Sequence, residues 1–189
     1  MPSTSIANNG QEGVFARKMV FCERLSRLDP SELIRQCPEC DDFFLYCCSC
    51  SMKSYETKTP CHHFRLVFTD GACLNNGQVG AKAGLGVAVG SLESGHHLSL
   101  PVNLNVDAGQ RRTSQRAEQL AALHGLAYLS EMTKLNTSRH YSNPPKEPEE
   151  DMNWIIATDS EYVVKGMTEW VPEWKVSDIA HVQTRLATY

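Results

Sequence analysis

The sequence predicts an α/β fold: a mixed sheet of three antiparallel strands and a parallel fourth, flanked by helices. Residues 65–70, 83–89 and 97–104 are rich in apolar residues and joined by short connections, which is typical of an antiparallel meander. Residues 113–134 follow with helical spacing of apolar side chains, which places Ala127 on the core face, and Thr113 or Ser114 is the expected helix cap. A fourth apolar run covers residues 153–158. Because a helix connects it to the meander, this fourth strand is expected to run parallel to the first.

Three carboxylates lie at the ends of these predicted elements. Asp70 and Asp159 each follow an apolar strand, and Glu118 lies in the first turns of the long helix. Adjacent parallel strands place their carboxyl ends at one edge of a sheet, so we expect the three carboxyl groups to converge to within about 4–6 Å. Such a group suits Mg²⁺, which prefers oxygen ligands. Taken singly, each acid also fits an ordinary turn or helix cap.

The cysteines are concentrated before the predicted sheet. Seven of the eight precede residue 62, and they include two Cys-x2-Cys pairs. Paired cysteines at this spacing are typical of zinc sites in proteins that do not form disulfides. We therefore predict one Zn²⁺ ion bound by Cys37, Cys40, Cys47 and Cys50. Cys48, Cys61 and His63 are alternative ligands, and free thiols on a surface hairpin are the alternative without metal.

The N-terminal residues and the overall charge give weaker indications. Residues 1–36 are expected to form a polar tail and short helices, one of them over residues 14–28. The net charge is −4, so any contact with phosphates must rest on a local basic patch. No apolar run is long enough to cross a membrane, which predicts no membrane partner. An intracellular location is expected, in the nucleus or cytoplasm, with the mitochondrion left open; oligomeric state has no sequence indicator.

Three motifs resemble type 1 ribonuclease H, in the family's order and at its spacing. They cover residues 68–73, 113–118 and 157–163, and the resemblance spans residues 64–175. It implies a ribonuclease H-like mixed sheet and hydrolysis of the RNA strand of RNA–DNA hybrids with two Mg²⁺ (or Mn²⁺) ions. The family's first three metal-binding carboxylates fall on Asp70, Glu118 and Asp159. Any one of the motifs alone would be weak evidence, whereas the three together are specific.

The same resemblance assigns substrate contacts. Those to RNA 2′-hydroxyls and phosphates fall on Gly71, Ala72, Cys73, Asn76 and Gln115. Thr113 matches a contact to a DNA phosphate, and Trp170 lies in the family's substrate-side region. Reading a 2′-hydroxyl is how such a site distinguishes RNA from DNA. Trp170 and Trp174 also fit a simple packing role.

Residues 37–63 are thus expected to form a cysteine-rich zinc module, and residues 64–175 a ribonuclease H-like domain. Residues 176–189 lack the Gly-His-x-Gly-Asn-x-x-Ala-Asp pattern with which the family supplies a mobile histidine and a fourth aspartate. Asp178 and His181 stand there without matching context. The resemblance therefore predicts a domain that is incomplete at its C-terminus and cleaves hybrids slowly or not at all. The alternative is a non-catalytic protein that uses this fold to bind nucleic acid or a protein partner.

Overall fold

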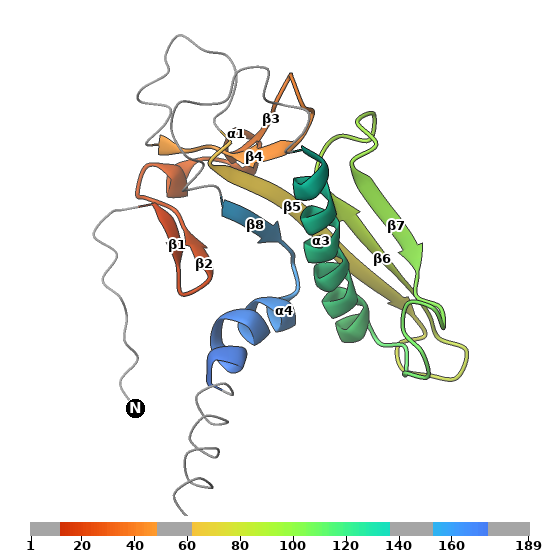
Figure 1. Cartoon of the computed structure of the whole chain (residues 1–189). Helices are drawn as coiled ribbons and strands as arrows, with labels where there is room; N and C mark the ends of the chain where they lie inside the picture. Colours follow the sequence, from red (N-terminus) through yellow and green to blue (C-terminus); the bar gives the residue numbers. More distant parts are fainter. Residues whose placement is uncertain (1–11, 49–61, 137–152, 174–189) are drawn as a thin grey trace, which may run out of the picture.

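The fold is organised around one mixed sheet (Figure 1). The computed structural model describes residues 12–48, 62–136 and 153–173. Within those ranges the sheet has six strands, in the order β3-β4-β5-β6-β7, with β8 pairing to β5. Their bounds are β3 Ile34–Gln36, β4 Phe43–Leu45, β5 Phe64–Leu74, β6 Lys82–Ala88, β7 His97–Pro101 and β8 Asn153–Ala157.

The predicted meander and its parallel fourth strand are confirmed. β5 pairs antiparallel with β6, and β6 pairs antiparallel with β7. β8 runs parallel to β5, in a register that begins with Phe64 opposite Asn153 and ends with Phe68 opposite Ala157. β5 is thus the central strand of this part of the sheet, as its apolar sequence predicts.

Two strand ends differ from the prediction. β5 does not stop at Asp70 but continues to Leu74, with Gly71 paired to Leu85 of β6. The turn comes later, at Asn75, whose φ of 53° lies in the left-handed region. β7 ends at Pro101 and not at residue 104, although the Val102 N–H still donates to the Ala83 carbonyl of β6 at 2.8 Å.

The helix α3, Ser114–Asn136, packs on β5 and β6 (Figure 1). Most of its buried positions recur at helical spacing, and those described are Ala117, Ala121, Ala122, Gly125, Leu129 and Met132. Gly125 belongs to this face because a Cβ there would lie 2.7 Å from Thr69 Cγ2. Ala127, which the sequence pattern placed on the core face, is exposed. None of the described helices combines the length and apolar character needed to cross a membrane.

The N-terminal region corrects the prediction of a helix over residues 14–28. A hairpin occupies its first part, with β1 Gly13–Phe15 paired to β2 Lys18–Val20. Ala16 and Arg17 form its turn with φ values of 47° and 66°, and two left-handed residues suit the twist of a two-residue hairpin. A single 3-10 turn, η1 Leu25–Arg27, follows. A short helix, as expected within residues 1–36, is present as α1, Pro30–Leu33.

The cysteine segment joins the same sheet through β4. Phe44 of β4 pairs with Arg65 of β5, and the Phe43 backbone N–H donates to the Val89 carbonyl at 2.7 Å. β4 therefore lies beside the first half of β5, and β6 beside the second half. On the face away from α3, the buried residues Leu45, Cys47, Phe64 and Leu66 form a core that Met19 and Phe21 of the N-terminal region cover.

Candidate active site

Asp70, Glu118 and Asp159 come together at one place in the fold. Asp70 lies within β5, Glu118 in the second turn of α3, and Asp159 directly after β8. One carboxylate oxygen from each lies within 4.8 Å of the other two. Asp70 and Asp159 are exposed, whereas Glu118 is half-buried. The expected convergence is therefore present.

The strand register explains why the two aspartates meet. Phe68 and Ala157 are the last residue pair between β5 and β8. Asp70 and Asp159 each follow that pair by two residues, so they reach the same level at the carboxyl edge of the parallel pair. Ser160 then begins α4, Glu161–Lys165, because its Oγ accepts a hydrogen bond from the Val163 N–H at 3.4 Å. Asp159 thus lies in the short connection between the end of β8 and the start of α4.

A close approach of α3 to β5 brings in Glu118. A Cβ on Gly71 would lie 2.2 Å from the Ala117 carbonyl carbon and 2.3 Å from the Glu118 nitrogen. Only a glycine leaves room for the helix backbone at this distance. Gly71 therefore has a packing role beside the substrate contact that the family resemblance implies.

The N-terminus of α3 is fixed by two polar side chains. Thr113 Oγ1 accepts from the Arg116 N–H at 3.2 Å, which is the helix cap expected from the sequence. Asn76 Oδ1 accepts from the Ser114 N–H at 3.0 Å and so ties the β5–β6 loop to the same helix end. Two residues with implied substrate contacts therefore also hold the helix that carries Glu118.

Burial and charge act together on Glu118. Loss of solvent raises the pKa of its carboxyl, and the negative charges of Asp70 and Asp159 raise it further, while a hydrogen bond from the Gly71 N–H opposes them. Its Oε2 is buried and has no hydrogen-bond partner among the described residues. A buried carboxylate oxygen without a donor, next to two more carboxylates, fits a divalent cation bound through oxygen.

The remaining positions with implied substrate contacts are Ala72, Cys73, Gln115 and Trp170, and the first three lie close in sequence to Asp70 or Glu118. Ala72 and Gln115 are exposed, on β5 and in the first turn of α3, and Cys73 is half-buried. Trp170 ends a π-helical turn, η2 Gly166–Trp170, and its ring packs edge-on against Tyr162 at 5.0 Å between centroids. Trp174 lies outside the described residues.

An ion pair that the sequence analysis missed supports the start of α3. Arg116 binds Asp107 with two hydrogen bonds, Nε to Oδ2 at 2.5 Å and Nη2 to Oδ1 at 2.6 Å. Arg112 donates to the carbonyls of Val102 at 2.9 Å and Gln110 at 2.7 Å. These bonds hold the loop before α3 against the helix. No local pattern identifies the pair, because its acid lies in an irregular loop.

This pair predicts a pH-dependent contribution to stability. The hydrogen bond from Arg116 holds the pKa of Asp107 below its usual 3.8, so the pair stabilises the fold above that pH and loses its effect as the pH falls through the lowered value. Arg116→Met should therefore lower the melting temperature at pH 7, and its difference from the wild type should shrink below pH 3.8. Arg27→Met, which removes an exposed pair with Glu23, should change little at either pH. A difference independent of pH would contradict this role of Asp107.

Five of the six described cysteines lie in three groups, and the sixth, Cys73, lies on β5. Cys37 and Cys40 lie beside His62. Cys47 Sγ lies 3.5 Å from His63 Nδ1, and Cys22 Sγ lies 3.4 Å from Cys48 Sγ. Burial raises the pKa of Cys40 to about 12, while a backbone hydrogen bond from Asp42 opposes the shift. Cys50, from the predicted zinc set, and Cys61 lie outside the described residues.

Comparison with known proteins supports the geometric evidence. The RNase H family model matches residues 63–186, and so extends past residue 175, the expected end of the resemblance. Ribonuclease H of Schizosaccharomyces pombe is 31% identical over 128 residues, which cover 68% of this chain and 38% of that protein. Ribonuclease H1 of Mus musculus is 33% identical over 112 residues, 58% of this chain and 30% of that protein. Ribonuclease H of Photorhabdus luminescens is 30% identical over 109 residues, which cover 58% of this chain and 51% of that protein.

The chain spans between about a third and a half of the length of these relatives. The family match nevertheless covers well over half of the chain itself. It includes the central strand, the long helix and the strand end that bring Asp70, Glu118 and Asp159 together. On this evidence the chain belongs to the ribonuclease H family.

Proposed function

We propose that this protein is a metal-dependent endonuclease that hydrolyses the RNA strand of RNA–DNA hybrids. The observation that carries the proposal is the convergence of three carboxylates from three separate elements to within 4.8 Å. The relatives named above are ribonucleases H, which supports this choice among the reactions that a carboxylate cluster can serve.

Asp70, Glu118 and Asp159 are the residues that would hold Mg²⁺ or Mn²⁺. When bound, such ions supply an activated water and stabilise the charge on the leaving oxygen of a phosphodiester. Glu118 is fitted to this role by its buried Oε2 without a hydrogen-bond donor. Asp70 and Asp159 are exposed, so a phosphodiester can reach them from solvent. Burial and the charges of Asp70 and Asp159 raise the pKa of Glu118, and a bound cation would offset that repulsion.

The residues around the cluster would provide selectivity for the hybrid. Gly71, Ala72, Cys73, Asn76 and Gln115 are proposed to contact the RNA strand, since a reader of the 2′-hydroxyl distinguishes RNA from DNA. Thr113 is proposed to contact a DNA phosphate, with Trp170 on the substrate side. The protein carries a net charge of −4, so binding should depend on these local contacts and weaken with salt.

Four labelled oligonucleotide substrates of the same sequence test the substrate prediction: an RNA–DNA hybrid, duplex DNA, duplex RNA and single-stranded RNA. In Mg²⁺ we expect slow cleavage of the hybrid's RNA strand alone, and EDTA should abolish it because the carboxylates then lack their cation. Mn²⁺ should restore it. Equal cleavage of single-stranded RNA, or cleavage in EDTA, would contradict the proposal. Hybrid binding without cleavage would favour the non-catalytic role instead.

A further inference from the structure

The loop between β3 and β4 presents two thiols from a constrained backbone. Cys37 follows β3, and Cys40 lies within the loop. The Cys37 N–H donates to the Asp42 carbonyl at 3.0 Å, and the Asp41 N–H donates to the Cys37 carbonyl at 2.9 Å. Asp41 has a φ of 60°, which turns the chain back into β4. The spacing of a Cys-x2-Cys pair is here combined with a fixed loop geometry.

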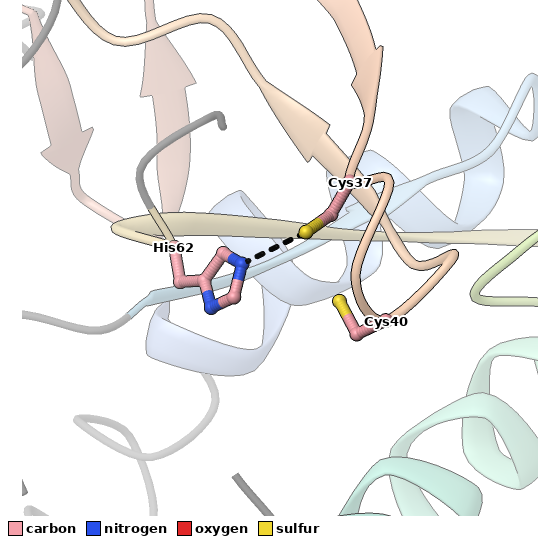
Figure 2. Close-up of side chains that lie close together, drawn as sticks. All are labelled: Cys37, Cys40 and His62. Atoms are coloured by element: carbon pink, nitrogen blue, oxygen red, sulfur yellow. Dashed lines mark hydrogen bonds between the residues drawn. The ribbon is translucent and has the colours of Figure 1, made fainter. Parts of the chain in front are cut away.

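His62 meets these thiols from the opposite side. It lies two residues before β5, and its ring stacks on the buried Phe44 at 4.3 Å between centroids and an angle of 9°. Its Nε2 lies 3.5 Å from Cys37 Sγ. Figure 2 shows the side chains of Cys37, Cys40 and His62 directed toward one another. One ligand atom from each lies within 4.8 Å of the other two.

The separation of His62 and Cys37 suits ligands of a single tetrahedral ion. Thiolate sulfur and imidazole nitrogen bind Zn²⁺ at about 2.3 and 2.0 Å, so two such ligands of one ion lie roughly 3.5–3.8 Å apart. The separation of 3.5 Å between His62 and Cys37 falls in this range. Cys37 is fully buried, and two thiols with an imidazole are ligands that zinc accepts and Mg²⁺ does not.

We propose that Cys37, Cys40 and His62 form a zinc site that fastens the N-terminal cysteine segment to the start of β5. This set keeps the first Cys-x2-Cys pair of the sequence prediction but takes His62 as its partner, whereas Cys47 lies against His63. The site is distinct from the carboxylate cluster. Asp70 follows His62 by eight residues of nearly extended chain, a distance of about 26 Å along the strand direction. Its contribution is to stability, because metal bound only by the folded state stabilises that state.

Metal analysis of the purified full chain tests the ligand set. We expect zinc at one ion per chain at this site. Cys37→Ser, Cys40→Ser and His62→Ala should each lose it and lower the melting temperature, and a chelator should lower the melting temperature of the wild type in the same way. Cys73→Ser, which changes a thiol on the distant half of β5, is the matched control and should keep the zinc. Loss of zinc from Cys47→Ala with retention in His62→Ala would overturn the proposal.

A second measurement keeps the test decisive if a variant fails to fold. In the Co²⁺-substituted wild type, the thiolate-to-metal absorption per ion should correspond to two thiolate ligands. A site made of the four cysteines predicted from the sequence would give twice that intensity. His62→Cys should retain the ion and raise the absorption by about half, since it converts two thiolate ligands into three. An unchanged absorption in His62→Cys, or a four-thiolate intensity in the wild type, would exclude His62 as a ligand.

Discussion

Asp70→Asn is expected to reduce hybrid cleavage by at least about 100-fold, which corresponds to about 2.7 kcal/mol in the activation free energy. Among the described residues, Asp70 belongs to the one candidate metal-binding group that consists of carboxylates alone. The side-chain amide of asparagine binds a divalent cation far more weakly than a carboxylate does. The rate of cleavage of a labelled hybrid, measured with enzyme in excess over substrate, checks the expectation.

The same substitution should leave the fold intact, which separates a chemical from a structural effect. Asp70 is exposed, and its charge contributes to the raised pKa of Glu118. Removing that repulsion should keep or slightly raise the melting temperature without Mg²⁺, and should abolish the further rise that Mg²⁺ gives the wild type. Glu93→Gln, at an exposed acid of the β6–β7 loop, is the control and should retain both cleavage and the Mg²⁺ effect. Wild-type cleavage by Asp70→Asn would refute the assignment of this site.

Gly71→Ala should have the second large effect, and through packing. The added methyl group overlaps the backbone of α3 at 2.2 Å, so the helix must move away from β5. Overpacking of this kind typically costs about 1–3 kcal/mol, and here the movement also displaces Glu118 from Asp70 and Asp159. We expect lower stability in urea unfolding together with weaker Mg²⁺ binding and strongly reduced cleavage.

Gly84→Ala is the matched control for this prediction. Gly84 lies on β6 opposite Ala72, and a Cβ there would meet only the Leu100 carbonyl oxygen at 3.6 Å, an ordinary contact. That variant should be as stable as the wild type or slightly more stable, because alanine loses less backbone entropy on folding. If Gly71→Ala and Gly84→Ala behaved alike, the close approach of α3 would not be what positions Glu118.

The residues around Gly71 also show what the sequence could and could not predict. The apolar run before Asp70 and the helical spacing after Thr113 define β5 and α3 by their own periodicity, and the strand–helix–strand order then predicts β8. A glycine after Asp70 suggests a turn, since glycine commonly marks one. In the fold it is a close contact with a helix more than 40 residues away, which no local pattern reveals. The N-terminal hairpin is hidden for a related reason, because Ala16 and Arg17 adopt left-handed conformations that such residues rarely take.

Within the candidate sites, prediction depended on register. The two aspartates could be placed because they share a position relative to paired strands, and Glu118 because it follows a recognisable helix cap. Asp107 could not, since its partner Arg116 is brought to it by an irregular loop. For the cysteine cluster the sequence offered His63, whereas its neighbour His62 faces Cys37 and Cys40. Consecutive residues entering a strand point in different directions, so a choice between neighbours needs the three-dimensional register.

The shared edge of β5 gives the N-terminal segment a protective role. β6 pairs with β5 only from Phe68 onward, and β4 occupies the edge beside Arg65. In a chain trimmed to begin at residue 62, the first half of the central strand would have unpaired N–H and C=O groups along one edge. Phe64 and Leu66 would also lose their contact with Leu45. An exposed apolar strand edge of this kind recruits strands from other molecules. By covering this strand edge, the segment that carries the cysteines should reduce self-association, independently of any metal it binds.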